Sequence, residues 1–292
     1  MLTLFRLLAH LPLGLLQRVG ALLGRLAWLA SPALRRHALA NTAQARVDAA
    51  LAPQSVIAMG QALAELPWLW FAARKRGVLP LLRWDGAEHF EAALDARRGV
   101  ILVLPHIGCW EMVGQSLAEK YGPTRGPLVA MYRPARKAWL RPLIASSRDR
   151  PGMQAVPTSV AGVRSLIKVL RAGGYTAILP DQVPPDGQGV WAPWFGRPAY
   201  SMTLLPRLAQ QTGAALLLAW CERLPAGHFV MHFAPLGSPD LSPDRLAALH
   251  TPGADLAECT ALVNAGMERV VRRCPQQYLW SYQRYKHPRK DI

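Results

Sequence analysis

The sequence predicts an α/β fold, with a mostly parallel central sheet flanked by helices and a helical, membrane-associated N-terminal region. Up to about residue 80 the chain has helical character throughout. Beyond that point, short apolar runs bounded by Gly and Pro alternate with helical stretches, and this alternation is typical of a parallel sheet with helices on its faces. We therefore expect a helical region over residues 1–80 and an α/β domain over residues 81–292.

The N-terminal segment 2–30 predicts a helix that lies on a membrane surface. It is rich in leucine but lacks the roughly twenty uninterrupted apolar residues of a transmembrane helix. At ~100° per residue its polar side chains fall within an arc of about 120°, although Pro12 must bend the helix. These side chains are Arg6, His10, Gln17, Arg18 and Arg25. A polar stripe on an apolar helix is typical of an interfacial helix on anionic lipid. A packed core helix with a solvated stripe and a cleaved signal peptide are the alternatives.

The remaining elements follow from capping residues and apolar runs. Ser31 followed by Pro32 predicts the start of a second helix, and Gly77 ends a third helix over residues 54–76. Two further helices are expected at 110–121 and 159–172. The expected strands are the apolar runs at 100–105, 127–132, 175–180, 214–220 and 228–233.

Composition limits the partners of the chain. Apolar residues make up 51% of it, and 34 Lys and Arg against 18 Asp and Glu leave a formal charge of +16. Such a charge suits nucleic acid or an anionic membrane, or reflects a basic enzyme from a GC-rich genome. The sequence contains no zinc finger, RNP motif or heptad zipper. We therefore expect no nucleic-acid partner and expect contact with anionic lipid.

Neither a metal site nor a disulfide framework is expected. The four cysteines are far apart and form no C-x-x-C pair. His228 and His232 alternate on a predicted strand, but no third ligand stands at metal spacing.

The segment 104–114 contains the clearest catalytic pattern. His106 follows a predicted strand, and Glu111 lies in the first turn of the next helix. An imidazole can accept a proton from a hydroxyl when a carboxylate fixes its tautomer and stabilises the imidazolium, and Gly108 allows a tight turn between the two residues. The pattern predicts a catalytic pair of His106 and Glu111. Chance spacing of the two residues, or a thiol nucleophile at Cys109, are the alternatives.

Four sequence blocks resemble a known family. HIGCWE at 106–111 resembles the H-x4-(D/E) signature of the lysophospholipid acyltransferase superfamily. With its Gly and Trp it looks like the lipid A biosynthesis branch, the late lauroyl and myristoyl acyltransferases. Further blocks similar to that branch occur in the same order: YRP at 132–134, LPDQVPPDGQGVWAPWFGRPA at 179–199 and PQQYLWSYQRYKHPR at 275–289. The resemblance spans about residues 1–290.

The resemblance implies transfer of a fatty acyl chain from a thioester of acyl carrier protein, or of coenzyme A, to a lipid hydroxyl. Acyl carrier protein is then a co-substrate and partner, and no metal, other cofactor or acyl-enzyme is needed. His106 would remove the proton of the hydroxyl, and a helix N-terminus or a cation would stabilise the oxyanion. Arg133 is the candidate cation, or it grips a phosphate of the acceptor.

Further substrate-binding candidates follow the strand at 175–180. We expect Asp181 and Gln182 to shape the acceptor site, with a capping role as the alternative. The next loop is expected to form a wall for lipid or acyl chain, with core packing of its aromatic residues as the alternative. The candidates in this loop are Gly187, Gly189, Trp194, Phe195 and Arg197. The closing basic residues from Arg284 onward are either solvated or meet lipid or carrier protein.

The sequence thus predicts an acyltransferase that acts on a lipid A precursor at the cytoplasmic face of an inner membrane. The same chemistry on a glycerophospholipid, an ornithine lipid or a glycolipid is one alternative. A non-catalytic membrane-binding protein on this fold is the other.

Overall fold

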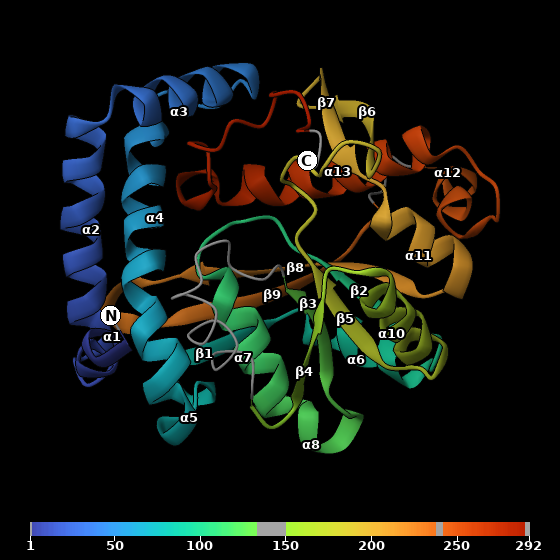
Figure 1. The fold of residues 1–292 in the computed structure, drawn as a ribbon, viewed down its shortest axis with the longest axis horizontal. Coiled ribbons are helices and arrows are strands. Elements are labelled where there is room, and N and C mark those ends of the chain that lie inside the picture. Colours follow the sequence, from blue (N-terminus) through green and yellow to red (C-terminus); the bar gives the residue numbers. More distant parts are fainter. Residues whose placement is uncertain (1, 133–149, 238–241, 290–292) are drawn as a thin grey trace.

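The computed structural model describes residues 2–132, 150–237 and 242–289 (Figure 1). A seven-stranded sheet lies at the centre, helices cover both of its faces, and the N-terminal helices stand at one end of it. The strand order is β1 (Leu82–Asp85), β9 (Phe229–Pro235), β8 (Ala215–Arg223), β2 (Val100–Val103), β5 (Tyr175–Ile178), β3 (Leu128–Tyr132) and β4 (Met153–Pro157). All neighbours are parallel except β8 and β9. The predicted α/β class with a mostly parallel sheet is confirmed.

The five predicted strands are β2, β3, β5, β8 and β9. The sequence did not predict β1 and β4, which are the two ends of the sheet in the described part of the chain. Both strands contain exposed residues, whereas all four residues of β2 are buried. Because edge strands are covered less completely, they lack the continuous apolar run that marks a buried parallel strand. The antiparallel hairpin of β6 (Gly189–Trp194) and β7 (Arg197–Met202) was also not predicted.

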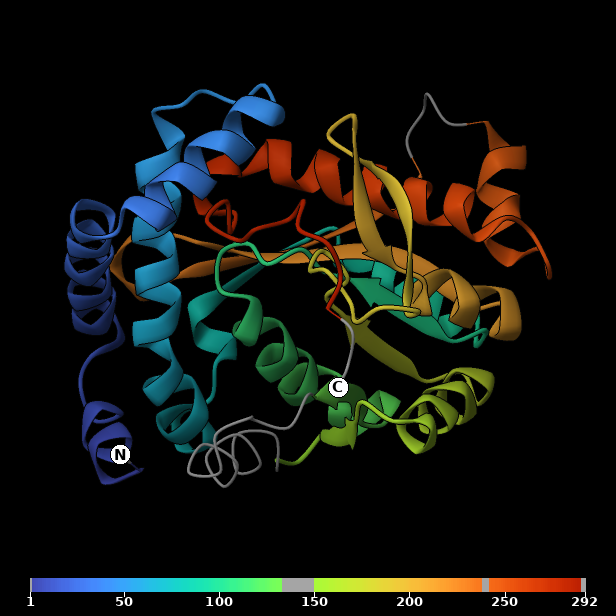
Figure 2. The ribbon, with the colours of Figure 1, turned by 45° about the horizontal axis from the view of Figure 1, so that its top comes forward.

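Helices pack on the two faces of the sheet in two groups (Figure 2). One face is covered by α6 (Ala87–Asp95) and α7 (Trp110–Lys120), whereas α10 (Val160–Arg171), α11 (Leu204–Thr212) and α13 (Leu256–Arg273) cover the other. The shorter helices are α8 (Gly122–Arg125), α12 (Pro243–Ala247), η2 (Leu79–Leu81), η4 (Pro225–Gly227), η5 (Ala248–His250) and η6 (Pro275–Gln277). The helices predicted at 110–121 and 159–172 are therefore confirmed as α7 and α10.

The N-terminal region is helical, as predicted, but Pro12 breaks the first helix rather than bending it. Its elements are α1 (Leu2–Leu8), α2 (Leu13–Ala30), α3 (Pro32–Gln44), α4 (Leu51–Pro67), the π-helix η1 (Trp68–Ala72) and α5 (Ala73–Arg76). Ser31 caps α3 as expected, because its hydroxyl accepts a hydrogen bond from the amide of Leu34 (3.4 Å). Both hydrophobic core clusters contain residues from before and after residue 80.

Helix α2 divides its apolar residues between two faces. One face packs closely on α4, where a Cβ on Gly20 would lie 2.6 Å from the carbonyl oxygen of Gly60. The opposite face exposes a row of large apolar side chains: Leu15, Val19, Leu22, Leu23, Leu26 and Leu29. Arg18 and Arg25 are exposed at the border of that row. By length and composition alone, the segments Leu13–Ala30 and Leu51–Arg76 could each cross a membrane.

Candidate active site

His106 lies in a loop at the carboxyl end of β2, directly before α7. Backbone hydrogen bonds hold this loop against β8, against η6 and against the segment that follows η6. The amide of Leu279 donates to the carbonyl of His106 (3.1 Å). The amide of Gly108 donates to the carbonyl of Gln277 (3.1 Å), and the amide of Cys109 donates to the carbonyl of Cys221 (2.9 Å). The loop that carries the histidine is therefore tied to two other parts of the fold.

Gly108 is required by this close packing. Its φ is +58°, and a Cβ at this position would lie 2.0 Å from the carbonyl oxygen of Cys221. No side chain fits there without moving β8. Gly108 thus forms a β-bridge with Cys221 in a backbone conformation that favours glycine.

Asp181 contacts His106 through both of its carboxylate oxygens. Its Oδ1 lies 2.6 Å from Nδ1 of the imidazole, and its Oδ2 accepts the backbone amide of His106 at 2.8 Å. Asp181 follows β5, which pairs with β2, so the two residues leave neighbouring parallel strands at the same edge of the sheet.

The environment of Asp181 keeps it ionised at neutral pH. Burial alone would raise the pKa of this carboxyl, but the interaction with His106 and the charge of Arg284 bring it below its ordinary value. An ionised carboxylate accepts the proton on Nδ1, and in that tautomer the lone pair of Nε2 is the acceptor on the opposite side of the ring.

The Nε2 side of the imidazole is the side available to a substrate. The amide nitrogen of Gln182 lies 3.4 Å from Nε2, the ring of Trp110 is 5.4 Å away between centroids, and 16% of the histidine side chain is exposed. Asp181 and Gln182 were expected to shape the acceptor site, and the structure brings both of them to the ring of His106.

Glu111 lies in the first turn of α7, as expected. Its Oε2 accepts a hydrogen bond from the indole of Trp70 in η1 (3.3 Å), and Phe5 of α1 stacks on that indole at 6.0 Å between centroids. The sequence assigned the orientation of the imidazole to Glu111, whereas the carboxylate on Nδ1 is that of Asp181. A catalytic role for Glu111 stays a prediction.

The other predicted substrate-binding residues lie in or near the β6–β7 hairpin. Trp194 and Phe195 are buried in the core, which corresponds to the packing alternative. Gly187 lies in an exposed turn before β6, and Gly189 is the first residue of β6. Arg197 is exposed, and its guanidinium carbon lies 4.6 Å from the ring centroid of Tyr285. Arg133 lies outside the residues that the structure describes.

The structure corrects one expectation about the C-terminal basic residues. Arg284 is buried rather than solvated. Its guanidinium donates to the carbonyl of Tyr200 (2.8 Å) and to the hydroxyl of Ser201 (2.5 Å), and it lies over the ring of Trp194. This position also explains its electrostatic effect on Asp181.

A buried ion pair that the sequence did not predict lies behind the His106 loop. Nε and Nη2 of Arg223 contact the two carboxylate oxygens of Glu65 at 2.6 and 2.7 Å, and Nη2 also donates to the carbonyl of Gly108 (3.2 Å). Burial alone would lower the pKa of Arg223, but the charge of Glu65 raises it overall. Glu65 is the one acidic residue in the apolar segment 54–76, and this was the signal for a buried partner.

The cysteines are unsuited to nucleophilic catalysis. Cys109 is buried, and burial together with the neighbouring carboxylate of Glu65 raises the pKa of its thiol well above the ordinary value. A reactive cysteine needs its thiolate form. Within the described ranges, no group of three or more His, Cys, Asp or Glu side chains could hold a metal ion.

A histidine base beside a buried carboxylate, at the carboxyl edge of a parallel sheet, defines a site that can deprotonate a hydroxyl for transfer chemistry. The chain belongs to the bacterial lipid A biosynthesis acyltransferase family, whose profile matches residues 1–287. It is an acyltransferase that acts on lipid acceptors.

Three relatives show the range of similarity. A lipid A biosynthesis lauroyltransferase of Escherichia coli is 26% identical over 238 residues, which cover 78% of this chain and 69% of the relative. A lipid A biosynthesis palmitoleoyltransferase of the same organism is 25% identical over 240 residues, with the same two shares. A phosphatidylinositol mannoside acyltransferase of Mycobacterium tuberculosis is 31% identical over 139 residues, or 47% of this chain and 42% of the relative.

Proposed function

We propose that this acyltransferase moves a fatty acyl chain from acyl carrier protein to a hydroxyl of a lipid A precursor at the cytoplasmic face of an inner membrane. The observation that carries the proposal is the pairing of His106 with Asp181 inside a chain that matches the family along residues 1–287. The lauroyl- and palmitoleoyltransferases among the relatives support a fatty acyl group and a lipid A acceptor.

The reaction is a single displacement in which His106 acts first as base and then as acid. Nε2 takes the proton of the acceptor hydroxyl while the oxygen attacks the thioester carbonyl. The tetrahedral intermediate collapses to the ester, the C–S bond breaks, and the departing sulfur takes the proton back from Nε2. Asp181 holds the proton on Nδ1 and stabilises the transient imidazolium.

The oxyanion of the intermediate needs a positive partner. Helix α7 begins four residues after His106, and its first amides carry the partial positive charge of the helix dipole. Arg133 is the candidate for a second, cationic contribution. Glu111 lies in the same helical turn and would position the groups around the hydroxyl.

Attachment to the membrane would use the exposed apolar row of α2. This row spans Leu15 to Leu29, where the side chain of Leu29 is 69% exposed, and the other face of the helix is packed on α4. Burial of apolar area in the headgroup and acyl boundary, with Arg18 and Arg25 on anionic lipid, is the arrangement of an interfacial helix.

A glycolipid of the phosphatidylinositol mannoside type is the second candidate acceptor, because one relative with that activity is 31% identical over part of the chain. Purified protein would be incubated with acyl carrier protein or coenzyme A thioesters and with each acceptor, followed by mass spectrometry of the lipids. We expect one added acyl chain on the lipid A precursor with the carrier-protein donor, and none with His106→Ala. Acylation of the mannoside alone would replace the proposed acceptor.

A further inference from the structure

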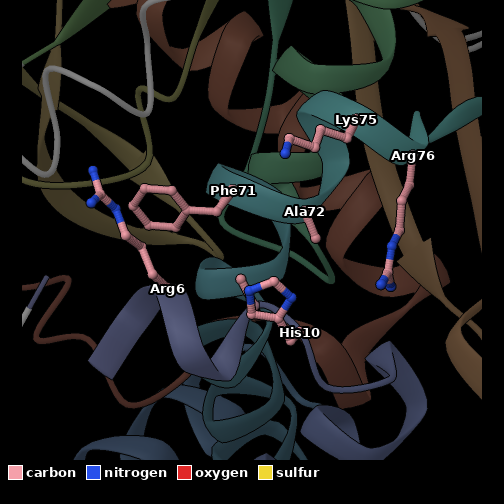
Figure 3. A pocket seen from close by; sticks show the side chains of 7 residues that line it. Arg6, His10, Phe71, Ala72, Lys75 and Arg76 are labelled. Atoms are coloured by element: carbon pink, nitrogen blue, oxygen red, sulfur yellow. The ribbon is translucent and has the colours of Figure 1, made fainter. Parts of the chain in front are cut away.

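A basic hollow of about 570 Å³ lies between α1 and the end of the η1–α5 segment. Its basic lining residues are Arg6 from α1, His10 from the turn after α1, and Lys75 and Arg76 from α5. Figure 3 shows these four side chains on different sides of the hollow, with Phe71 and Ala72 between them. In the part of the chain that the structure describes, no acidic side chain lines it.

The hollow combines positive charge with an apolar floor. Arg6 lies over the ring of Phe71, with its guanidinium carbon 6.0 Å from the ring centroid. This contact leaves the N–H edges of the guanidinium available for an anion. Three permanent cations around one concave surface attract an anion far more strongly than scattered surface charges do.

The position of the hollow links it to the membrane-facing part of the molecule. Leu4 and Leu7, on the same short helix as Arg6, are 51% and 63% exposed. These exposed apolar side chains beside a cationic hollow match a ligand that has both a hydrocarbon part and an anionic part.

The hollow also lies close to the candidate active site along the chain. Phe71 directly follows Trp70, whose indole donates to Glu111. A molecule held in the hollow would therefore contact the residue next to the one that supports Glu111.

We propose that this hollow binds the phosphate of an anionic lipid headgroup. Arginine binds phosphate oxygens in a bidentate manner, lysine contributes a compact charge, and the headgroup phosphate of a lipid carries the complementary charge. The exposed leucines favour a lipid phosphate over free inorganic phosphate, which has no apolar part. The inference rests on the membrane attachment proposed above, and it assigns one specific site to the anionic lipid.

The test compares two double variants that remove the same charges. Lys75→Gln/Arg76→Gln alters the hollow, and Arg164→Gln/Lys168→Gln alters exposed residues of α10 on the far side of the sheet. Full-length protein is sedimented with phosphatidylcholine vesicles that contain phosphatidic acid, with and without inorganic phosphate at constant ionic strength. Melting curves verify that both variants fold.

We expect the hollow variant to lose roughly tenfold in vesicle affinity, because two cations near an anionic surface are removed from a specific site. The α10 variant should lose no more than about twofold, through net charge alone. Inorganic phosphate should not displace the wild-type protein. Equal losses in the two variants would overturn the proposal, because general surface charge would then explain binding. Displacement by inorganic phosphate would overturn the assignment to lipid.

Vesicle binding needs neither an acyl donor nor an acceptor, so its result is independent of the reaction. A selective loss in the hollow variant supports the inference even if no acyl transfer to a lipid A precursor is observed. If acyl transfer is observed and both variants bind vesicles equally, the proposed function is retained and the assignment of the hollow as a lipid-phosphate site is overturned.

Discussion

Replacement of Asp181 by Asn tests which carboxylate orients the catalytic histidine. In the protein, Oδ2 of Asp181 accepts the amide of His106 at 2.8 Å, and Oδ1 lies 2.6 Å from Nδ1. The side chain of asparagine has the same shape but only one acceptor oxygen. If that oxygen keeps the backbone hydrogen bond, the NH2 group faces Nδ1 and favours the tautomer that has its proton on Nε2. The base would then be lost without a change in the fold.

The expected magnitude follows from this change of tautomer. A correctly protonated general base contributes roughly 10²–10⁴-fold to a reaction rate, so Asp181→Asn should reduce kcat by about that factor. The KM for the acceptor should change little, because the binding surface is intact. Initial rates of ester formation, measured at saturating thioester with acceptor in detergent micelles, give both constants.

The pH dependence of stability provides an independent measurement on the same variant. The pKa of Asp181 is lowered from its ordinary value of 3.8, so its contribution to stability is present above that value and is lost as pH falls through the folded pKa. Asp181→Asn should therefore flatten the acid side of the curve of melting temperature against pH. A variant with nearly wild-type kcat and a correctly folded core would refute the orienting role of Asp181.

Three other predictions use the same rate and melting assays. His106→Ala should lower turnover by roughly 10²–10⁴-fold, and adding Asp181→Asn should cost little more, because the two residues act as a unit; losses that multiply would separate the two residues. Cys109→Ala should retain most activity, and acyl groups trapped on Cys109 in denatured protein would indicate a two-step mechanism instead. Glu65→Gln should cost about 3–5 kcal/mol in the free energy of unfolding, because it leaves Arg223 as an unpaired buried charge; an unchanged melting temperature would contradict that ion pair.

The sequence predicted the position of the histidine more reliably than its partner. A buried strand that ends in a polar segment can be recognised locally, and this located His106 and Asp181 at strand ends. Which strands are neighbours is a property of the topology, however, and the contact between β2 and β5 joins residues 75 positions apart. Without the strand order, the nearer carboxylate of Glu111 was the natural choice.

The buried pair of Glu65 and Arg223 shows the same limit. A lone acid in an apolar helix predicts a buried partner, because an uncompensated charge is too costly there. It does not predict which of the 34 Lys and Arg residues is that partner. The pair joins α4 to the end of β8 across 158 positions, and only the packing of α4 beside the sheet brings the two charges together.

Helix α2 illustrates a third limit. The periodicity of its sequence identifies a polar stripe, but it does not show which apolar side chains pack inside the protein and which face outward. A helix that is apolar over most of its circumference can pack entirely in a core or can face lipid with one side. In α2 the small residues Gly20 and Gly24 permit close contact with α4 and leave the larger leucines on the opposite side. Small residues that recur along one side of an apolar helix therefore mark the packed face. The face of leucines that they leave exposed, bordered by Arg18 and Arg25, is the surface that the proposed membrane attachment uses.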